Sequence, residues 1–310
     1  MFHKPSKYYD RYRWLRSDGT PNFNQRVYQK KTIARTLAKA GSETYSSTIP
    51  LLRVFELFYE KDLRALPLIK SGRRIDSVIS VRELISLLGG VYRSLIEIRH
   101  RDNLFEALNK ESARSISRKD YPMVYDDAEL REILEALILG EKGYVIVLDK
   151  DNNLIGVVTE RDIIELLREK PVGVKISEVM TTNVVAMKYE STLCDVLREM
   201  NILNIRRIPL IRSDGSLAGV VTARDIINFV GSHSLFKYLS SGEYEEFCRL
   251  PSNLVMKEAS IIDPDSDLGE ASERMINERT DYFIVVSGGE ASGIVTERDI
   301  VYGYVVLAKS

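Results

Sequence analysis

Cysteine, histidine and long apolar runs are all scarce in this 310-residue sequence. Two cysteines, Cys194 and Cys248, are too few for a disulfide framework, so we expect a cytoplasmic protein in which Cys194 packs on an amphipathic helix. Three scattered histidines disfavour a metal site. No apolar run approaches the about 20 residues that a membrane span needs, and the N-terminus lacks a signal-peptide core. We therefore expect no membrane association.

Catalytic signatures are also missing. The sequence has no P-loop, no nucleophile elbow and no zinc-protease motif. Its composition, 44% hydrophobic and 29% charged, is typical of a globular protein with room for roughly two domains. We expect no enzymatic activity and no catalytic cofactor.

The net charge of −1 hides an uneven distribution. Residues 1–42 contain ten Lys or Arg and two Asp, so they carry +8 and the remainder carries −9. This arm also contains Tyr8, Tyr9, Tyr12 and Trp14. Two interpretations stay open: the arm packs on the acidic body, or its cations and aromatic rings contact nucleic acid.

One eight-residue phrase recurs along the chain. It reads GVVTERDI at 156–163, GVVTARDI at 219–226 and GIVTERDI at 293–300, and SVISVREL at 77–84 is a degenerate copy. An amphipathic segment beginning with Leu precedes each copy by nearly the same interval. Two features in one register indicate four repeats.

The third copy defines the repeat unit. VVAM at 184–187 predicts a strand, the segment from Leu193 a helix, RRIPLI at 206–211 a second strand, and LAGVV at 217–221 a third. Thr222 then begins a second helix. The unit is β-α-β-β-α, and about 55–60 residues bury too little core to be stable alone.

The intervals between copies predict how the repeats pair. They run long, short, long, which groups copies one and two, and copies three and four. The expected organisation is an arm at 1–42, a first module at 43–170 with repeats at 43–90 and 120–170, and a second module at 171–310 with repeats at 175–231 and 252–306.

The phrase has a structural and a functional interpretation. Thr-x-x-Asp at a strand-to-helix corner is a helix capping box, and its Gly can serve tight packing. However, the acid is Asp in three copies, and each copy places Arg in the first helical turn, where a cation opposes the helix dipole. A carboxylate, a hydroxyl and a helix N-terminus suit the ribose and phosphate of a nucleotide.

The h-x-G-h-h-T-x-R-D signature on a β-α-β-β-α repeat resembles the CBS domain. Two such domains form a Bateman module, and four in one chain are similar to archaeal CBS proteins and to the γ subunit of AMP-activated protein kinase. The resemblance covers roughly residues 43–305. It implies an α/β fold of four repeats paired into two Bateman modules, which bind AMP, ADP or ATP in clefts between paired repeats.

The resemblance also implies the site residues. The ribose-binding acids match Asp162, Asp225 and Asp299, and the hydroxyls beside them match Thr159, Thr222, Thr296 and Ser80. Backbone contacts to the purine edge match Thr44, Met123, Ala186 and Ile261. A basic residue ahead of the second strand, which contacts phosphate, matches Arg206 and Arg207. For Arg161, Arg224 and Arg298 two interpretations stay open: phosphate contacts, or salt bridges on a solvated face.

The first copy departs from the pattern with Glu83, so we expect at most three competent sites, the best of them at Asp225. The expected function is that of a non-catalytic adenine-nucleotide sensor that reports energy state to an unknown protein partner. The alternative is a nucleic-acid-associated regulator that uses the arm at 1–42. Whether S-adenosylmethionine binds and whether two chains form a homodimer stay open.

Overall fold

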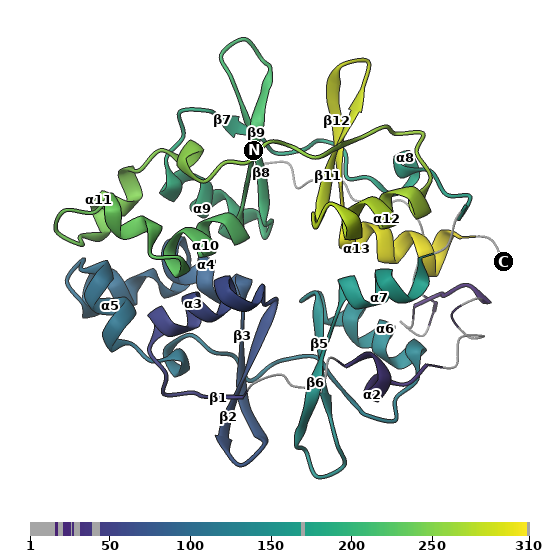
Figure 1. The fold of residues 1–310 in the computed structure, drawn as a ribbon, viewed down its shortest axis with the longest axis horizontal. Coiled ribbons are helices and arrows are strands. Elements are labelled where there is room, and N and C mark those ends of the chain that lie inside the picture. Colours follow the sequence, from purple (N-terminus) through teal and green to yellow (C-terminus); the bar gives the residue numbers. More distant parts are fainter. Residues whose placement is uncertain are drawn as a thin grey trace. The chain divides into compact units, whose positions relative to one another are not determined.

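The computed structural model describes residues 16–17, 21–25, 27, 32–38, 44–168 and 171–308. Within these ranges each repeat forms one three-stranded sheet (Figure 1). In every sheet the first strand runs parallel to the middle strand, which pairs antiparallel with the third. The α/β class and the predicted repeat unit are confirmed.

The repeats build two compact units that interleave along the chain. Unit 1 comprises residues 1–42, 122–184 and 259–310, and unit 2 comprises residues 43–121 and 185–258. Unit 2 therefore contains repeats one and three, and unit 1 contains repeats two and four. Each unit draws its core from repeats that are not consecutive in sequence.

Unit 2 begins with repeat one and continues with repeat three. The elements of repeat one and the segment after it are β1 (Tyr45–Ser46), α3 (Leu51–Lys61), β2 (Ala65–Ser71), β3 (Arg74–Ser80), α4 (Val81–Gly89), η2 (Val91–Arg93), η3 (Leu95–Arg99), α5 (Leu104–Lys110) and η4 (Ala113–Ser115). Those of repeat three are β7 (Met187–Lys188), α9 (Leu193–Leu203), β8 (Arg207–Ile211), β9 (Leu217–Thr222), α10 (Ala223–Gly231), η5 (Ser234–Lys237), α11 (Tyr244–Arg249) and η6 (Ser252–Leu254).

Unit 1 contains repeats two and four. The elements around repeat two are α2 (Ala34–Leu37), β4 (Met123–Tyr125), α6 (Leu130–Gly140), β5 (Tyr144–Leu148), β6 (Leu154–Thr159) and α7 (Glu160–Leu167). Those around repeat four are α8 (Ile176–Val179), β10 (Ile261–Ile262), α12 (Leu268–Asn277), β11 (Tyr282–Ser287), β12 (Glu290–Thr296), α13 (Glu297–Tyr302) and η7 (Gly303–Leu307). Within the described ranges no helix combines the length and apolar character of a membrane span.

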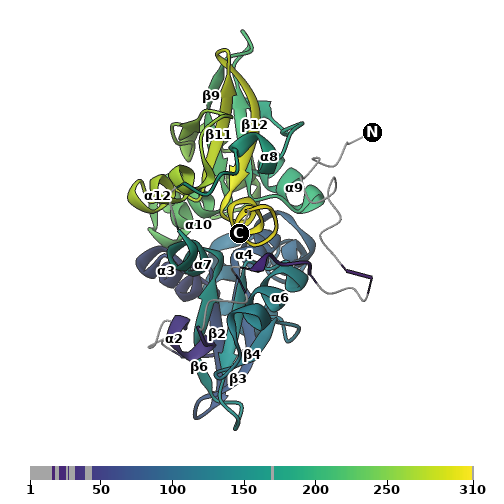
Figure 2. The ribbon, with the colours of Figure 1, turned by 90° about the vertical axis from the view of Figure 1, so that its right-hand side faces the viewer.

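Helices form the core of unit 2. α3 packs against α10 and α4 against α9, while the hairpins β2–β3 and β8–β9 point to opposite ends (Figures 1 and 2). The predicted apolar stripe of α9 is fully buried at Leu193, Val196, Leu197 and Met200. Each repeat thus buries its helices against those of the other, which provides the core that a single unit of this size lacks.

The described part of the N-terminal arm packs on unit 1. Phe23 and Val27 are buried in its core, the Asn24 backbone N–H donates to the carbonyl of Val305 at 2.8 Å, and Arg35 pairs with Asp126. This agrees with the interpretation that the arm lies on the body. The aromatic cluster Tyr8, Tyr9, Tyr12 and Trp14 falls outside the described residues.

Short segments ahead of the repeats bridge the third strands of other repeats. Arg118, ahead of repeat two, forms an antiparallel bridge with Val78 of repeat one. Lys257, ahead of repeat four, bridges Val220 of repeat three, with N···O distances of 2.9 and 3.0 Å. Thr181, ahead of repeat three, bridges Ile294 of repeat four. Each bridge lies within one unit, since Arg118 and Lys257 belong to unit 2 and Thr181 belongs to unit 1.

The glycines of the phrase lie beneath these bridges. A Cβ atom on Gly219 would lie 2.4 Å from the backbone oxygen of Lys257. On Gly293 it would lie 2.9 Å from the backbone oxygen of Thr181. No real Cβ approaches a backbone atom so closely, so these glycines are needed because another chain segment crosses them.

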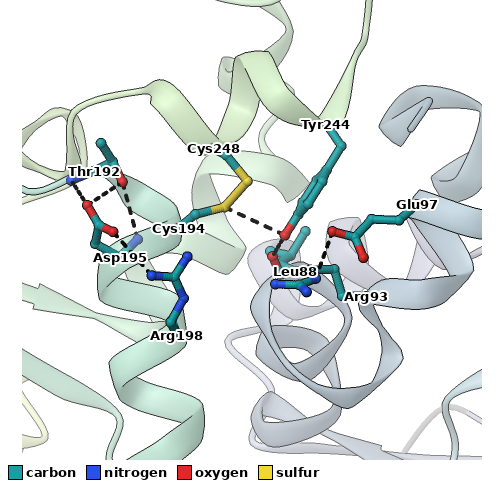
Figure 3. The surroundings of a disulfide bond; sticks show 9 residues. All are labelled: Leu88, Arg93, Glu97, Thr192, Cys194, Asp195, Arg198, Tyr244 and Cys248. Atoms are coloured by element: carbon teal, nitrogen blue, oxygen red, sulfur yellow. Dashed lines mark hydrogen bonds and ion pairs between the residues drawn. A yellow bond between two sulfur atoms is a disulfide. The ribbon is translucent and has the colours of Figure 1, made fainter. Parts of the chain in front are cut away.

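A disulfide joins Cys194 on α9 to Cys248 on α11 (Figure 3). The expectation that no disulfide forms and that Cys194 only packs was wrong, because residue counts do not show which side chains meet. Beside the bond, the buried hydroxyl of Tyr244 donates to the carbonyl of Leu88 at 2.5 Å, and burial raises the pKa of this phenol. The disulfide and this hydrogen bond hold α11 against α9 and the end of α4.

We predict that the double variant Cys194→Ala/Cys248→Ala is less stable than the natural chain, by up to about 4 kcal/mol, because a bridge of this span restricts the unfolded chain. Melting temperatures with and without reductant measure the effect, and the double variant should be insensitive to the reductant. Alkylation of both cysteines in the native, unreduced protein would show that the bond is not formed.

Candidate functional site

In the three intact copies of the phrase, the aspartate caps the N-terminus of the helix on which it lies. One oxygen of Asp162 accepts the backbone N–H of Thr159 at 2.8 Å and its hydroxyl at 2.6 Å. Asp299 repeats this geometry with Thr296 at 2.9 and 2.7 Å. Asp225 does the same with Thr222, whose N–H lies 3.1 Å away. The capping interpretation of the phrase is thereby confirmed.

The degenerate first copy keeps the same cap. Glu83 accepts the backbone N–H of Ser80 at 2.8 Å and its hydroxyl at 2.6 Å. The longer side chain therefore serves the capping box as well as Asp does. Capping alone gives no reason for Asp in the other three copies.

Asp225 uses its two carboxylate oxygens differently. Oδ2 binds Thr222, whereas Oδ1 lies 2.6 Å from Nζ of Lys257. The Asp225 side chain is 5% exposed and that of Lys257 is 68% exposed. One oxygen is therefore committed to the helix, and the other faces a single flexible cation that reaches it from the crossing segment.

Two motif arginines bind the opposite repeat of unit 1. Nε of Arg161 lies 2.8 Å from Glu297, and Nε of Arg298 lies 2.8 Å from Glu160. Both glutamates are almost fully buried. The two pairs are reciprocal, since each phrase supplies an arginine to the other and a glutamate in return.

The same arginines also contact the end of the opposite repeat's first helix. Arg161 donates to the carbonyl of Met275 in the last turn of α12 at 3.3 Å and to that of Thr280 just beyond it at 2.6 Å. Arg298 donates to the carbonyl of Glu141, which ends α6, at 2.9 Å. The guanidinium charge is unfavourable at the N-terminus of the arginine's own helix. It stabilises the C-terminal end of another helix instead. Phosphate contacts by Arg161 and Arg298 stay a prediction.

Unit 2 has no such reciprocal glutamates, because Val81 and Ala223 occupy their positions. Arg224 pairs instead with Asp62, the residue that ends α3. The fourth motif arginine, Arg82, is exposed and lines a groove between α4 and α9. The two units therefore use the shared arginine position differently.

The four predicted purine-contact positions lie at the starts of the first strands. Met123 and Ile261 begin β4 and β10, while Thr44 and Ala186 directly precede β1 and β7. The carbonyl of Ile261 accepts a hydrogen bond from Arg274 at 3.1 Å. The placement agrees with the predicted register, and contact with a purine stays a prediction.

Arg206 and Arg207 lie beside the Asp225 corner. Arg207 is the cross-strand partner of Thr222, and the carbonyl of Arg206 accepts the N–H of Ala223 at 2.8 Å. The sequence analysis missed two further cations. Arg64 in DLRALPLI aligns with Arg206 in NIRRIPLI, which the repeat alignment would have shown. No sequence pattern indicates Lys257, because its contact with Asp225 depends on the backbone segment that crosses Gly219.

Metal binding has no support in the part of the chain that the structure describes. There, no cluster of three or more His, Cys, Asp or Glu side chains is arranged to hold an ion. The corner consists of a carboxylate, a hydroxyl and neighbouring cations.

A family model for the CBS domain matches residues 113–169, 176–232 and 252–305, which together make up more than half of the chain. The chain belongs to the CBS domain family. The first CBS repeat lies outside the matched ranges, but its sheet has the same strand order and directions as the other three. Its Ser77, Ser80 and Glu83 explain the weaker signature.

Two proteins of other organisms are similar over most of the chain. An uncharacterised 33.4 kDa protein in the ribosomal RNA operon of Thermofilum pendens is 30% identical over 77% of this chain and 79% of its own length. MJ1225 of Methanocaldococcus jannaschii is 27% identical over 83% of this chain and 93% of its own. The crystal structure of MJ1225 superposes with a TM-score of 0.81 at 24% identity, over 88% of this chain and all of that one.

We predict that Arg161→Met destabilises the protein by about 3 kcal/mol, because it leaves the Glu297 carboxylate buried without its cation. The double variant Arg161→Met/Glu297→Leu should regain much of this loss, since no buried charge then remains. Thermal and urea unfolding of the full chain measure both effects.

The matched control is Arg249→Met, which removes an exposed Arg249–Glu245 pair of the same chemistry. Such exposed pairs contribute about 0–1 kcal/mol. Equal losses in Arg161→Met and Arg249→Met would contradict a special role for the reciprocal pairs.

Proposed function

We propose that this CBS protein is a non-catalytic regulatory protein that binds AMP, ADP or ATP where β9 meets α10. The proposal rests on the carboxylate of Asp225, whose two oxygens have different partners. Oδ2 is held by Thr222, so the side chain is fixed in place, and Oδ1 faces the exposed end of Lys257. A ribose with two adjacent hydroxyls is a suitable partner for a carboxylate fixed in this way.

The charges around the corner favour a phosphorylated ligand. Arg206, Arg207 and Lys257 approach the start of α10 from the middle strand and from the crossing segment. The dipole of α10 adds a favourable field for an anion at this helix start. Lys257 can release Asp225 and turn to a phosphate, because its side chain is largely exposed.

The interleaved chain supports a role in regulation. Lys257 lies in the segment that connects repeats three and four, and its backbone bridges Val220 of repeat three. A ligand that engages Asp225 and displaces Lys257 acts on a segment shared by two repeats. Its effect depends on different affinities for two arrangements of that segment.

Similarity to MJ1225 supports the same proposal. That protein's crystal structure is described as that of a candidate archaeal homologue of the γ subunit of AMP-activated protein kinase. The shared four-repeat fold makes adenine nucleotides the first ligands to test. The downstream protein partner of the present chain has to be found by other means.

We predict that at least one of AMP, ADP and ATP binds the full chain at micromolar to millimolar concentration, and that Asp225→Asn weakens this binding at least tenfold. The reason is the loss of charge-assisted hydrogen bonds to the ribose, each about 1.5–3 kcal/mol. Isothermal titration with each nucleotide measures the affinities.

Asp195→Asn is the matched control, because Asp195 closes the start of α9 with Thr192 in the same capping geometry, at 3.1 and 2.7 Å. Both variants should lose similar stability, and only Asp225→Asn should lose affinity. Absence of binding by the natural chain at millimolar nucleotide, or equal affinities of the two variants, would refute the proposal.

A further inference from the structure

The ends of α3 and α9 are equivalent positions with different charges. Both helices end at a residue in the left-handed conformation, Asp62 with φ 50° and Asn204 with φ 55°. Asp62 provides the carboxylate that pairs with Arg224 of the other repeat. By the symmetry of unit 2, Asn204 stands where a carboxylate would pair with Arg82. The sequence places a neutral amide there instead.

Arg82 is thus the exception among the four motif arginines. Arg161, Arg298 and Arg224 each pair with an acid, whereas no ion pair of Arg82 occurs among the residues that the structure describes. Arg82 and Asn204 line one groove of about 580 Å³ between α4 and α9. This volume is in the range of small-molecule sites, about 300–1,000 Å³.

The groove is cationic and contains no acid among its lining residues. Arg93 and Arg198 line it in addition to Arg82, and Figure 3 shows both of them near the disulfide. Each has one acid on its own segment, Glu97 at 2.8 Å and Asp195 at 3.7 Å, and neither acid lines the groove. An anion in the groove therefore meets three guanidinium groups, of which Arg93 and Arg198 already pair with acids outside the lining and Arg82 does not.

Apolar side chains flank the guanidinium groups. Val91 and Ile202 line the groove and are 81% and 60% exposed. Together they offer apolar surface that a bound molecule would cover. Ile85 and Met200 extend the apolar lining between the two helices. The lining therefore fits an apolar body that carries an anionic group.

We propose that this groove of unit 2 binds an organic anion, in which one phosphate or carboxylate group on an apolar body supplies Arg82 with the negative charge that Asp62 supplies to Arg224. The guanidinium fork matches either oxyanion with two parallel hydrogen bonds. The site is separate from the Asp225 corner and does not depend on the function proposed there.

The decisive variant is Asn204→Asp, because it adds the missing carboxylate and removes no cation. The probe is 8-anilinonaphthalene-1-sulfonate, an aromatic anion whose fluorescence rises in apolar surroundings. We expect it to bind the natural chain at one site, and we expect Asn204→Asp and Arg82→Gln each to weaken that binding at least tenfold. The melting temperature of Asn204→Asp should be unchanged or higher, since the new acid pairs with Arg82.

Two controls separate this site from other effects. Arg249→Gln removes an exposed arginine of α11, and Asp225→Asn alters the nucleotide corner, so neither should change the binding of the probe. Unchanged binding by Asn204→Asp would overturn the proposal, as would equal losses in Arg82→Gln and Arg249→Gln.

Displacement of the probe identifies the anionic group. Phenyl phosphate and hydrocinnamate present a phosphate and a carboxylate on a similar apolar body. Displacement by one assigns that group, and displacement by both assigns the shared oxyanion chemistry. If neither compound displaced the probe, the proposed site would be refuted. If only inorganic phosphate displaced it, the proposal that the ligand has an apolar body would be refuted.

Discussion

The structure of each unit depends on an arginine that serves a helix other than its own. In the first turn of the second helix of a repeat, this cation opposes the local dipole. It is retained because its guanidinium group reaches the end of the opposite repeat's first helix, as Arg161 does at Thr280 and Arg298 does at Glu141. The local cost is offset by a contact between repeats, and that contact brings two incomplete cores together.

Much of the fold could be predicted from the sequence, because the repeats and the spacing of apolar residues indicate the helices and strands. The phrase and the apolar stripe of α9 each depend on neighbours in sequence, so their elements agree with the structure. The compact units could not be predicted in the same way. Repeat spacing reports how the chain was duplicated, whereas the units depend on which helix faces bury one another, such as α3 with α10.

The candidate site shows the same division between local and distant information. Thr222 and Asp225 follow from a four-residue motif, and their cap is as expected. Lys257 and the bond between Cys194 and Cys248 join residues that are far apart in sequence, and no local pattern marks them. Gly219 had two explanations in the sequence, and the crossing backbone of Lys257 is sufficient for it. The preference for Asp over Glu is left for the ligand to explain.

The alternation of the chain between units constrains how the protein can be made. Residues 43–121 belong to unit 2 and residues 122–184 to unit 1. Each segment packs against a repeat that follows later in the sequence. When repeats one and two have emerged from the ribosome, each unit therefore has only one of its two repeats, and neither core is complete. Unit 2 can be completed only once residues 185–258 have emerged, and unit 1 only once residues 259–310 have followed. The nascent chain must keep its first two repeats soluble until then, which makes the charged surface of each repeat a requirement of biosynthesis as well as of the folded state.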